Sequence, residues 1–552
     1  MRTKKSEPPK DKVVPSTDDT VLSSNETVSP IEKTELSPDD AASSNDGNVS
    51  PSDEIAVPTD ETTSPSLKAI VPATNEAATS VNDGVPSDDE VTKPVNDVEP
   101  LTAENVAPID AAITPSSDVV ASPTDETASS PGEIETRLKE TVPAGAAQQT
   151  WRAVVEPWWK ATLAVLPTFL VTRFIFLLLS YFGGVLFFVK NYAATVIPLH
   201  DMIYYWDYWD AKRFATLATN GYVTPDYAAF FPLYPTLVHI LTALTHRDVL
   251  AVSMFISNAA FLGMLIVLYR FVTVEFDKDT AKRTVLYISI FPTAIFFFAG
   301  YNESLFLFLT LLFFYTVRRR SWWLAGLFGL LATLTRSSGI FLALVFVLEY
   351  LRQNWPLLRE EWQSKEPARM VRPLANLSAM LLIPLGLAIY SFALYRRFGD
   401  ALAFIHAQSN WRQGLTFPLL TPLSTLKKIV TLPLFSFTSA HSIIDLTAAV
   451  LFTVLLAMCF VGPYRLKRSQ WTLPLFGVLI LITTMLYPNL PRAGGLFDPL
   501  ASTQRLVLEA FVGFIILARL GRRPWFHQLY LLISLPMLAF LTLQFMTGHW
   551  TV

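Results

Sequence analysis

Beyond Trp151 the chain is a succession of apolar segments separated by short polar loops, and many of these segments approach the length that a bilayer requires. Backbone groups exposed to lipid must hydrogen-bond within their own segment, so such segments fold as helices. We therefore expect an all-α polytopic membrane protein with about eleven spans. The predicted spans are 160–188, 249–274, 284–299, 303–317, 322–336, 339–352, 374–395, 440–462, 471–487, 503–520 and 528–546.

The distribution of Lys and Arg predicts which loops are cytoplasmic. Basic clusters mark 278–283, 318–320, 352–373, 465–468 and 522–523 as inner loops, with the N-terminus inside and the C-terminus outside. The outer segments are then 189–228, 300–302, 396–439 and 488–502. The apolar stretch 230–245 would break this alternation if it crossed the bilayer, so we expect it to be a re-entrant or partly inserted helix.

The first 149 residues have a different composition, without any Phe, Trp or Tyr. Through Glu140 they hold 29 acidic and 10 basic residues, a net charge of −19. Such a segment cannot bury enough apolar surface to offset the entropy of ordering it. We therefore expect residues 1–149 to be a disordered, acidic, Ser/Thr/Pro-rich cytoplasmic tail, and residues 150–552 to be the multi-pass domain.

Cysteine and histidine usage excludes some chemistry. The single cysteine, Cys459, cannot form an intrachain disulfide. The seven histidines are scattered without the spacing of a zinc site. The sequence requires no metal, although it is compatible with a divalent ion, and nothing in it predicts a nucleic-acid partner.

The predicted first outer loop, 189–228, contains the stretch "YYWDYWD" at 204–210. Asp207 and Asp210 are three residues apart and would share one face of a helix. Trp206, Trp209 and Tyr205 would then seat that helix at the headgroup level. A carboxylate held there is a candidate general base. A solvated acid or a helix N-cap is the alternative, and the loop alone leaves both open.

Two further stretches place polar or aromatic residues at the outer side. "AFFPLYP" at 229–235 forms a rigid apolar shelf that would hold lipid or pack against helices. The turn between two predicted spans leaves Tyr301, Asn302 and Glu303 at the outer interface. An acid beside apolar helices is a functional candidate, whereas Asn302 or Ser304 could simply cap the next helix.

Two arginines stand in apolar surroundings near the outer side. Arg336 follows an apolar stretch and should meet a counter-charge, for which Glu303, Asp210 or a bound phosphate are candidates. Arg505 begins another predicted span. Guanidinium groups match phosphate oxygens, so the pair suggests an anionic ligand. The alternative is that both side chains snorkel to the interface.

Several of these stretches resemble the PIG-V type of mannosyltransferase. The matching motifs are Trp209-Asp210-x-x-x-Phe214, Ala218-x-x-Gly221-Tyr222, Ala229-Phe-Phe-Pro-x-x-Pro235, Gly300-Tyr301-x-Glu303-x-Leu305-Phe306 and Thr335-Arg336-Ser337-x-Gly339. They keep their order along 160–546. The stretch "GDALAFIHAQSNW" at 399–411 looks like the form seen in prokaryotic relatives.

The resemblance implies a GT-C-like bundle that transfers a hexose, most often mannose, from a polyprenyl-phosphate carrier. Asp210 matches the catalytic acid position of this family, and Asp207 lies outside the motif. It implies an inverting reaction at the outer face of the cell membrane, with Asp210 as base and a glycolipid, glycan or protein as acceptor. The candidate substrate-binding residues, from the motifs and from the charged positions together, are Trp209, Arg213, Tyr222, Tyr301, Asn302, Glu303, Arg336 and Arg505.

The sequence leaves two other classes open. A transporter or lipid flippase should show internal repeats and charges deep in several helices, whereas the unusual polar residues here gather at the predicted outer side. A lipid-linked polysaccharide polymerase or ligase would place its main polar site in a large late loop, for which 396–439 is the candidate. Lys212 and Arg213 make the segment after Asp210 unusually basic, and Arg213 is a further candidate for phosphate binding.

Overall fold

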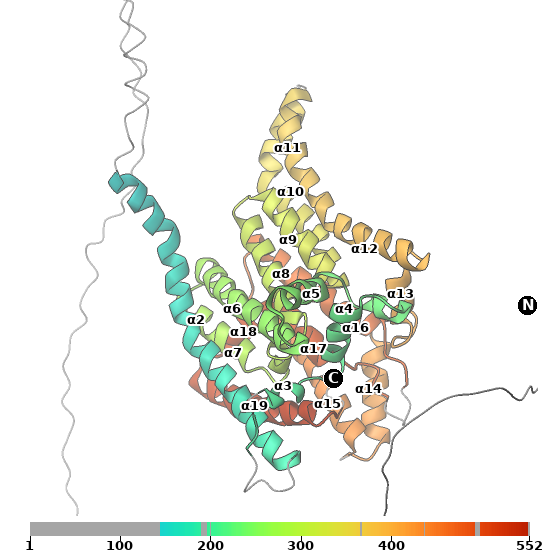
Figure 1. The fold of residues 1–552 in the computed structure, drawn as a ribbon. Coiled ribbons are helices and arrows are strands. Elements are labelled where there is room, and N and C mark those ends of the chain that lie inside the picture. The colour runs from blue at the N-terminus through green and yellow to red at the C-terminus, as the bar shows by residue number, and fades with distance from the viewer. Residues whose placement is uncertain are drawn as a thin grey trace, which may run out of the picture. The chain divides into compact units, whose positions relative to one another are not determined.

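The computed structural model describes residues 144–188, 196–198, 200–364, 367–434, 436–491 and 497–549 (Figure 1). The tail predicted to be disordered lies outside these ranges up to residue 143. From Ala144 the chain is helical.

The described part of the chain contains helices and no strand, apart from one isolated antiparallel bridge between Arg412 and Asn489. The all-α prediction is confirmed. The α-helices are α2 (Ala144–Phe187), α3 (Asp201–Tyr204), α4 (Asp210–Asn220), α5 (Leu233–Thr245), α6 (Val249–Glu275), α7 (Lys278–Ser289), α8 (Glu303–Arg318), α9 (Trp322–Thr335), α10 (Phe341–Gln363), α11 (Pro367–Ser378), α12 (Leu382–Phe398), α13 (Ala403–Gln408), α14 (Leu420–Thr431), α15 (Phe437–Met458), α16 (Thr472–Leu486), α17 (Thr503–Leu506), α18 (Phe511–Leu520) and α19 (Pro524–Met546). The short 3-10 helices are η1 (Pro225–Ala229), η2 (Ala294–Phe297), η3 (Ser337–Ile340), η4 (Ala379–Leu381), η5 (Arg468–Gln470) and η6 (Val507–Glu509).

The lengths and composition of these helices confirm a multi-pass membrane protein. Five described helical stretches are long and apolar enough to cross a bilayer: Val155–Phe187, Val249–Glu275, Arg369–Phe398, Phe437–Met458 and Pro524–Met546. Shorter apolar helices are α5, α9, α16 and α18. The count of eleven crossings and their orientation stay predictions.

Three predicted element boundaries are wrong. The segment 284–299 is not one helix, because α7 ends at Ser289 and Pro292 follows, which lacks the N–H that a continuing helix needs. The segment 503–520 is divided into α17, η6 and α18. The inner connection predicted over 352–373 is mostly helical, within α10 and α11.

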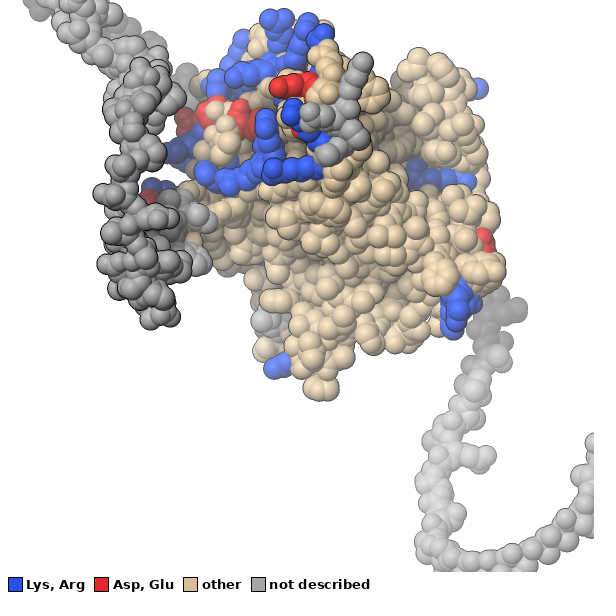
Figure 2. All heavy atoms as spheres, turned by 90° about the horizontal axis from the view of Figure 1, so that it is seen from above, with Lys and Arg blue, Asp and Glu red and all other residues tan. Residues whose placement is uncertain are grey.

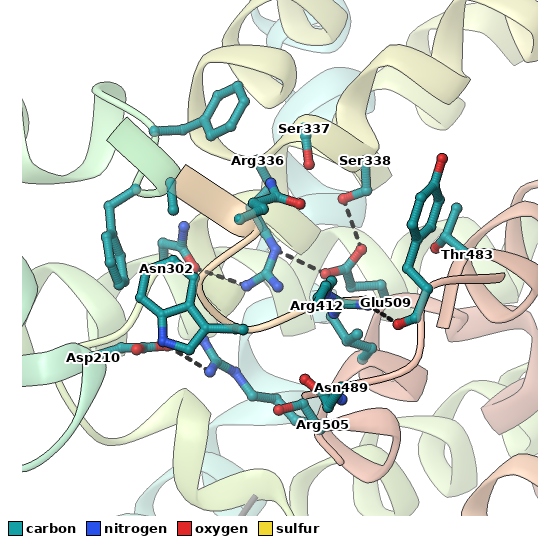
Figure 3. A pocket seen from close by; sticks show the side chains of 18 of the residues that line it. Asp210, Asn302, Arg336, Ser337, Ser338, Arg412, Thr483, Asn489, Arg505 and Glu509 are labelled. Carbon is teal, nitrogen blue, oxygen red and sulfur yellow. Dashed lines mark hydrogen bonds and ion pairs between the residues drawn. The ribbon is translucent and has the colours of Figure 1, made fainter. Parts of the chain in front are cut away.

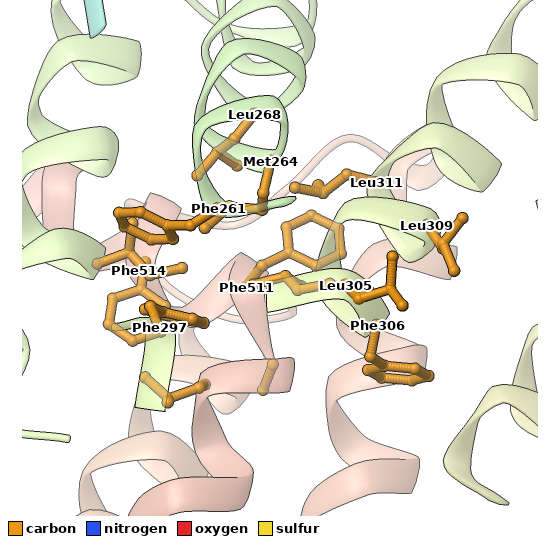
Figure 4. Close-up of a cluster of buried hydrophobic side chains, with 14 of the residues drawn as sticks. Phe261, Met264, Leu268, Phe297, Leu305, Phe306, Leu309, Leu311, Phe511 and Phe514 are labelled. Atoms are coloured by element: carbon orange, nitrogen blue, oxygen red, sulfur yellow. The ribbon is translucent and has the colours of Figure 1, made fainter. Parts of the chain in front are cut away.

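The centre of the membrane domain is filled by aliphatic and aromatic side chains from α6, α8 and α18 (Figure 4). Leu268, Phe306 and Phe514 are fully buried there. Lipid tails are as apolar as these side chains, so close van der Waals contact between helices is what stabilises the packing in a bilayer. Helix α8 is buried on nearly all sides. Its first residue, Glu303, is therefore held in a fixed place.

Glycines let α9 pack closely against η4 and α12. A Cβ atom added at Gly386 would lie 2.8 Å from the carbonyl oxygen of Leu330, and one at Gly326 would lie 2.3 Å from that of Ala379. Only glycine fits such contacts, as is common between membrane helices. This packing fixes the C-terminal end of α9, where Arg336 follows.

The outer surfaces of the peripheral helices are apolar. On α2, Leu170 and Phe174 expose 55% and 60% of their surface. On the face shown in Figure 2, Lys and Arg gather mainly in one patch, with a few Asp and Glu, beside a broad area without charged side chains. A surface without charged side chains is suited to contact with lipid.

Candidate active site

A cavity of about 780 Å³ lies where the segments predicted to face outward meet (Figure 3). This volume is in the usual range for small-molecule sites. Its charged lining residues are Asp210, Arg213, Arg336, Arg412, Arg505 and Glu509. Its aromatic lining residues are Trp209, Phe214, Phe230, Phe231, Phe341, Trp411 and Tyr487, and the polar ones include Asn302, Ser337, Ser338, Gln408, Asn410, Thr483, Asn489 and Ser502.

Asp210 is the first residue of α4 and lines the cavity. The preceding residue, Trp209, has a φ of 57°, a backbone conformation that residues other than glycine rarely adopt. This turn starts α4 abruptly at Asp210. A carboxylate in the first turn of a helix is also favoured by the helix dipole.

The prediction that Asp207 and Asp210 share a helix face is wrong. Helix α3 ends at Tyr204 and α4 begins at Asp210, so Asp207 lies in the turn between them. Asp207 is absent from the cavity lining. Burial raises the pKa of Asp207, with Lys212 opposing this shift and Asp248 adding to it. The two acids are therefore not equivalent.

The prediction that Trp206 anchors the loop at the headgroup level is also wrong. Its indole is only 1% exposed, and its Nε1 donates to the Ser180 hydroxyl at 3.0 Å. It packs against Phe176, Phe298 and Phe545, from three separate parts of the chain. Trp206 thus fixes the first outer loop to the membrane helices from inside.

Glu303 joins the two arginines that the sequence singled out. It is 2% exposed, and its Oε1 accepts hydrogen bonds from Arg336 Nη1 at 2.7 Å and from Arg505 Nε. Arg505 Nη1 also donates to Asp210 Oδ2 at 2.6 Å. The Arg505 guanidinium lies over the rings of Phe296 and Tyr301. The predicted counter-charge for Arg336 is confirmed, and Arg505 does not snorkel to the interface.

Arg336 has two more partners at the cavity wall (Figure 3). Its Nε forms an ion pair with Glu509 Oε1 at 2.8 Å, and its Nη1 donates to Asn302 Oδ1 at 2.9 Å. The Ser338 hydroxyl donates to the other Glu509 oxygen at 2.9 Å. Asn302 makes no side-chain cap for α8 and instead donates to the Thr335 carbonyl. Its role is to hold the Arg336 turn.

The remaining predicted residues have distinct positions. The Tyr301 hydroxyl accepts from the Asp210 backbone N–H at 3.2 Å, and burial raises the pKa of Tyr301 well above its ordinary value. Tyr222 is not among the lining residues, and its hydroxyl donates to the Phe230 carbonyl at 2.6 Å. Tyr222 therefore supports the shelf at 229–235, where Phe230 and Phe231 line the cavity. Arg213 and Trp209 line the cavity directly.

The sequence analysis missed Glu509, Trp411 and Arg412. Glu509 lies in "QRLVLEAF", four residues after Arg505, and an acid inside a predicted span is a signal that could have identified it. Trp411 is the last residue of the stretch at 399–411 that resembles prokaryotic relatives, and Arg412 follows it directly. The resemblance in that stretch assigned no role to either residue. Their loop pairs with 486–490 through the Leu490 N–H to the Trp411 carbonyl and the Gln413 N–H to the Pro488 carbonyl, both at 2.8 Å.

The charged groups of the cavity are arranged mainly as ion pairs. Among the described residues, no group of three or more His, Cys, Asp or Glu side chains is placed to hold a metal ion. Asp210, Glu303 and Glu509 face guanidinium groups instead. Such a site can orient one carboxylate toward a bound hydroxyl and supply positive charge to an anion.

The sequence comparison matches this site to a known family. Residues 186–419 match the family model described as Mannosyltransferase (PIG-V). The resemblance to PIG-V mannosyltransferases is confirmed. The PIG-V match includes Asp210, Arg336 and Arg412, whereas Arg505 and Glu509 lie beyond it in the chain.

Curated PIG-V relatives match over part of their length. GPI alpha-1,6-mannosyltransferase 2 of Mus musculus is 29% identical over 201 residues, which are 34% of this chain and 40% of the mouse protein. GPI mannosyltransferase 2 of Schizosaccharomyces pombe is 31% identical over 148 residues, 26% of this chain and 31% of the yeast protein. The chain thus spans less than half the length of these two relatives.

Two solved structures align with part of this chain. ArnT from Cupriavidus metallidurans, in a crystal structure with undecaprenyl phosphate, has a TM-score of 0.37 at 14% identity, covering 58% of this chain and 57% of ArnT. The Archaeoglobus fulgidus oligosaccharyltransferase, tethered to an acceptor peptide, has a TM-score of 0.36 at 12% identity, covering 69% of this chain and 55% of that protein.

Proposed function

We propose that this chain is an integral-membrane hexosyltransferase that moves a mannose-type sugar from a polyprenyl-phosphate carrier to an acceptor hydroxyl, with inversion. The observation that carries this proposal is the position of Asp210. It matches the catalytic acid of the PIG-V motif, lines a cavity of ligand size, and is held by Arg505.

In the proposed step, Asp210 accepts the proton of the acceptor hydroxyl as its oxygen bonds to the anomeric carbon. The bond from that carbon to the phosphate oxygen breaks, and its electron pair goes to the phosphate. Arg505 keeps the Asp210 carboxylate oriented through the 2.6 Å contact. The leaving phosphate needs positive charge rather than a proton donor, and arginines at the cavity can supply it.

The direction of α8 is consistent with a site on the outer side. Helix α8 begins at the cavity with Glu303 and ends at Arg318, which is followed by Arg319 and Arg320. Its length corresponds to roughly 24 Å at 1.5 Å per residue, most of the hydrocarbon thickness. Because basic clusters favour the cytoplasmic side, the cavity end is expected to be external.

The cavity also bears on the two alternative classes. Its charged and polar lining comes from the predicted outer segments and from the adjoining ends of predicted spans, rather than from a polar path along several spans, which favours an enzyme over a transporter. The late loop 396–439 contributes Gln408, Asn410, Trp411 and Arg412 to the lining. The candidate base, however, comes from the first outer loop, as in the PIG-V motif.

The direct test is transfer of labelled mannose from a polyprenyl-phosphate donor by the purified full-length protein. We expect Asp210→Asn to lower the rate by at least 10²-fold, within the range for loss of a general base. Asp207→Asn, the matched control three residues earlier in the chain, should retain much of the activity. A panel of polyprenyl-phosphate sugars would identify the donor. Activity of Asp210→Asn equal to that of the wild type would exclude Asp210 as the base.

A further inference from the structure

The four arginines that line the cavity fall into two pairs according to their partners. Arg336 and Arg505 each donate to two carboxylates, and Glu303 is common to both. Arg213 and Arg412 have no carboxylate partner in the part of the chain that the structure describes. The positive charge available to a ligand is therefore concentrated on the second pair.

Arg412 is a half-buried arginine whose guanidinium has no carboxylate partner among the described residues. Its Nη1 donates to the Tyr487 carbonyl at 3.2 Å (Figure 3). Burial lowers the pKa of Arg412, and the nearby positive charge of Arg336 lowers it further. Removing a charge from water beside another charge of the same sign is unfavourable unless an anion joins them. This arrangement favours an anionic ligand.

Arg213 approaches the same part of the cavity from α4. Its guanidinium lies over the Trp411 ring at 5.2 Å and over the Phe230 ring at 5.6 Å. Stacking on aromatic faces leaves the edge of a guanidinium free to donate hydrogen bonds. Trp411 is the direct neighbour of Arg412 in the chain. Arg213 thus stacks on Trp411, the chain neighbour of Arg412, and all three residues line the cavity.

The backbone around Arg412 is held by a second loop. The residues before and after Arg412 each form a backbone hydrogen bond with the loop at 488–490. In addition, Gln413 Nε2 donates to the Asn489 carbonyl at 2.9 Å. Asn489 Nδ2 in turn donates to the Ala501 carbonyl at 2.8 Å, just before the helix that carries Arg505. Arg412 is therefore placed by a framework shared with Arg505. A site built in this way loses little entropy when it binds a ligand.

We propose that Arg412 and Arg213 bind the phosphate group of the lipid-linked substrate, whereas Arg336 and Arg505 hold the carboxylates of the site. The ligand chemistry is a phosphate ester on a long apolar chain, and only its identification as a sugar carrier rests on the proposed function. In that reaction the phosphate changes from a diester to a monoester. It gains negative charge as its bond to the sugar breaks, so this arginine pair should favour the leaving group.

Binding can be measured without any sugar transfer. The purified full chain in detergent would be titrated with a polyprenyl monophosphate, and quenching of tryptophan fluorescence or native mass spectrometry would report occupancy. The uncharged polyprenol of the same length separates the contribution of the phosphate from that of the lipid tail. Inorganic phosphate, added as a competitor, separates recognition of the free anion from recognition of the lipid headgroup.

We expect Arg412→Gln to weaken binding of the monophosphate by roughly 10- to 100-fold, the usual effect of losing a charge-assisted hydrogen bond. Arg412→Lys should recover only part of it, because lysine cannot bind in a bidentate manner. Arg213→Gln is the second, independent variant and should also weaken binding. Arg396→Gln, at an exposed arginine outside the lining, is the matched control and should bind as the wild type does. Polyprenol binding should not change in any variant.

Inorganic phosphate should compete with the polyprenyl monophosphate for binding to the wild-type protein. It should not compete in the Arg412→Gln variant. Wild-type affinity of both Arg412→Gln and Arg213→Gln for the monophosphate would overturn the proposal, as would an equal loss of polyprenol binding. A protein that binds the monophosphate through Arg412 but transfers no sugar would contradict the transferase and leave this site standing. An active enzyme whose Arg412 and Arg213 variants both bind the monophosphate normally would contradict the site alone.

Discussion

At the scale of single residues, Glu303 is the centre of the charged site. One buried carboxylate oxygen accepts from both Arg336 and Arg505, and Arg505 continues the chain of contacts to Asp210. Four residues from separate parts of the sequence are thereby held in one arrangement. Removing one partner of a buried ion pair leaves the others without a counter-charge.

We therefore predict that Glu303→Ala destabilises the protein by about 3–5 kcal/mol and abolishes transfer. Thermal unfolding in detergent, followed together with activity, would measure both effects. Glu360→Ala, at an exposed acid of α10, is the control and should be neutral within about 0.5 kcal/mol. An unchanged unfolding temperature for Glu303→Ala would mean that the ion pairs do not stabilise the fold.

At the scale of elements, the N-terminus of α7 depends on one acid outside the membrane-spanning segments. Asp277 Oδ1 accepts from the Thr280 N–H at 2.8 Å, and Asp277 Oδ2 accepts from Arg522 at 2.6 Å. Burial alone would raise the pKa of Asp277, but the hydrogen bonds from Thr280 and Arg522 outweigh it and lower the pKa. The same acid thus caps α7 and joins it to the connection after α18.

Because the pKa is lower in the folded state, the stabilisation from the Asp277 charge is present above the unfolded pKa, about 4. It is lost as the pH falls through the folded pKa. We predict that Asp277→Ala costs about 1 kcal/mol at pH 7 and that this deficit shrinks below about pH 4. Unfolding temperatures measured across this pH range would test it. Asp279→Ala, an exposed acid in the same turn, should have little effect. A deficit that did not change with pH would assign the effect to the cap geometry alone.

At the scale of the whole molecule, the expected orientation places the cavity outside and the basic ends of the helices inside. The chain is suited to a labelling experiment, because its single cysteine, Cys459, is buried. We predict that a membrane-impermeant maleimide labels Ser409→Cys in intact cells, in a Cys459→Ala background. Arg359→Cys should be labelled only after permeabilisation. Both positions are exposed. The opposite labelling pattern would invert the topology.

The sequence was sufficient for the fold class and for one half of the site. Apolar segments of bilayer length allow little besides helices, since lipid offers no hydrogen bonds to the backbone. The motif around Trp209 and Asp210 distinguished Asp210 from Asp207, and the expected counter-charge for Arg336 followed from the expense of a charge among apolar side chains. The apolar composition continues through the helix breaks near Pro292 and within 503–520, so the sequence does not reveal them.

Only the tertiary structure decided how the charges are paired. Asp210 and Arg505 are 295 residues apart, and Arg336, which follows α9, is also distant in the chain from Glu509 in η6, so no local spacing encodes their contacts. Tertiary packing likewise made Trp206 a core residue rather than an interfacial anchor, and left Arg412 facing the cavity without a described carboxylate. Composition and periodicity determine which segments enter a bilayer, because solvation acts on each segment separately. Ion pairing depends on distances that exist only after the helices have packed.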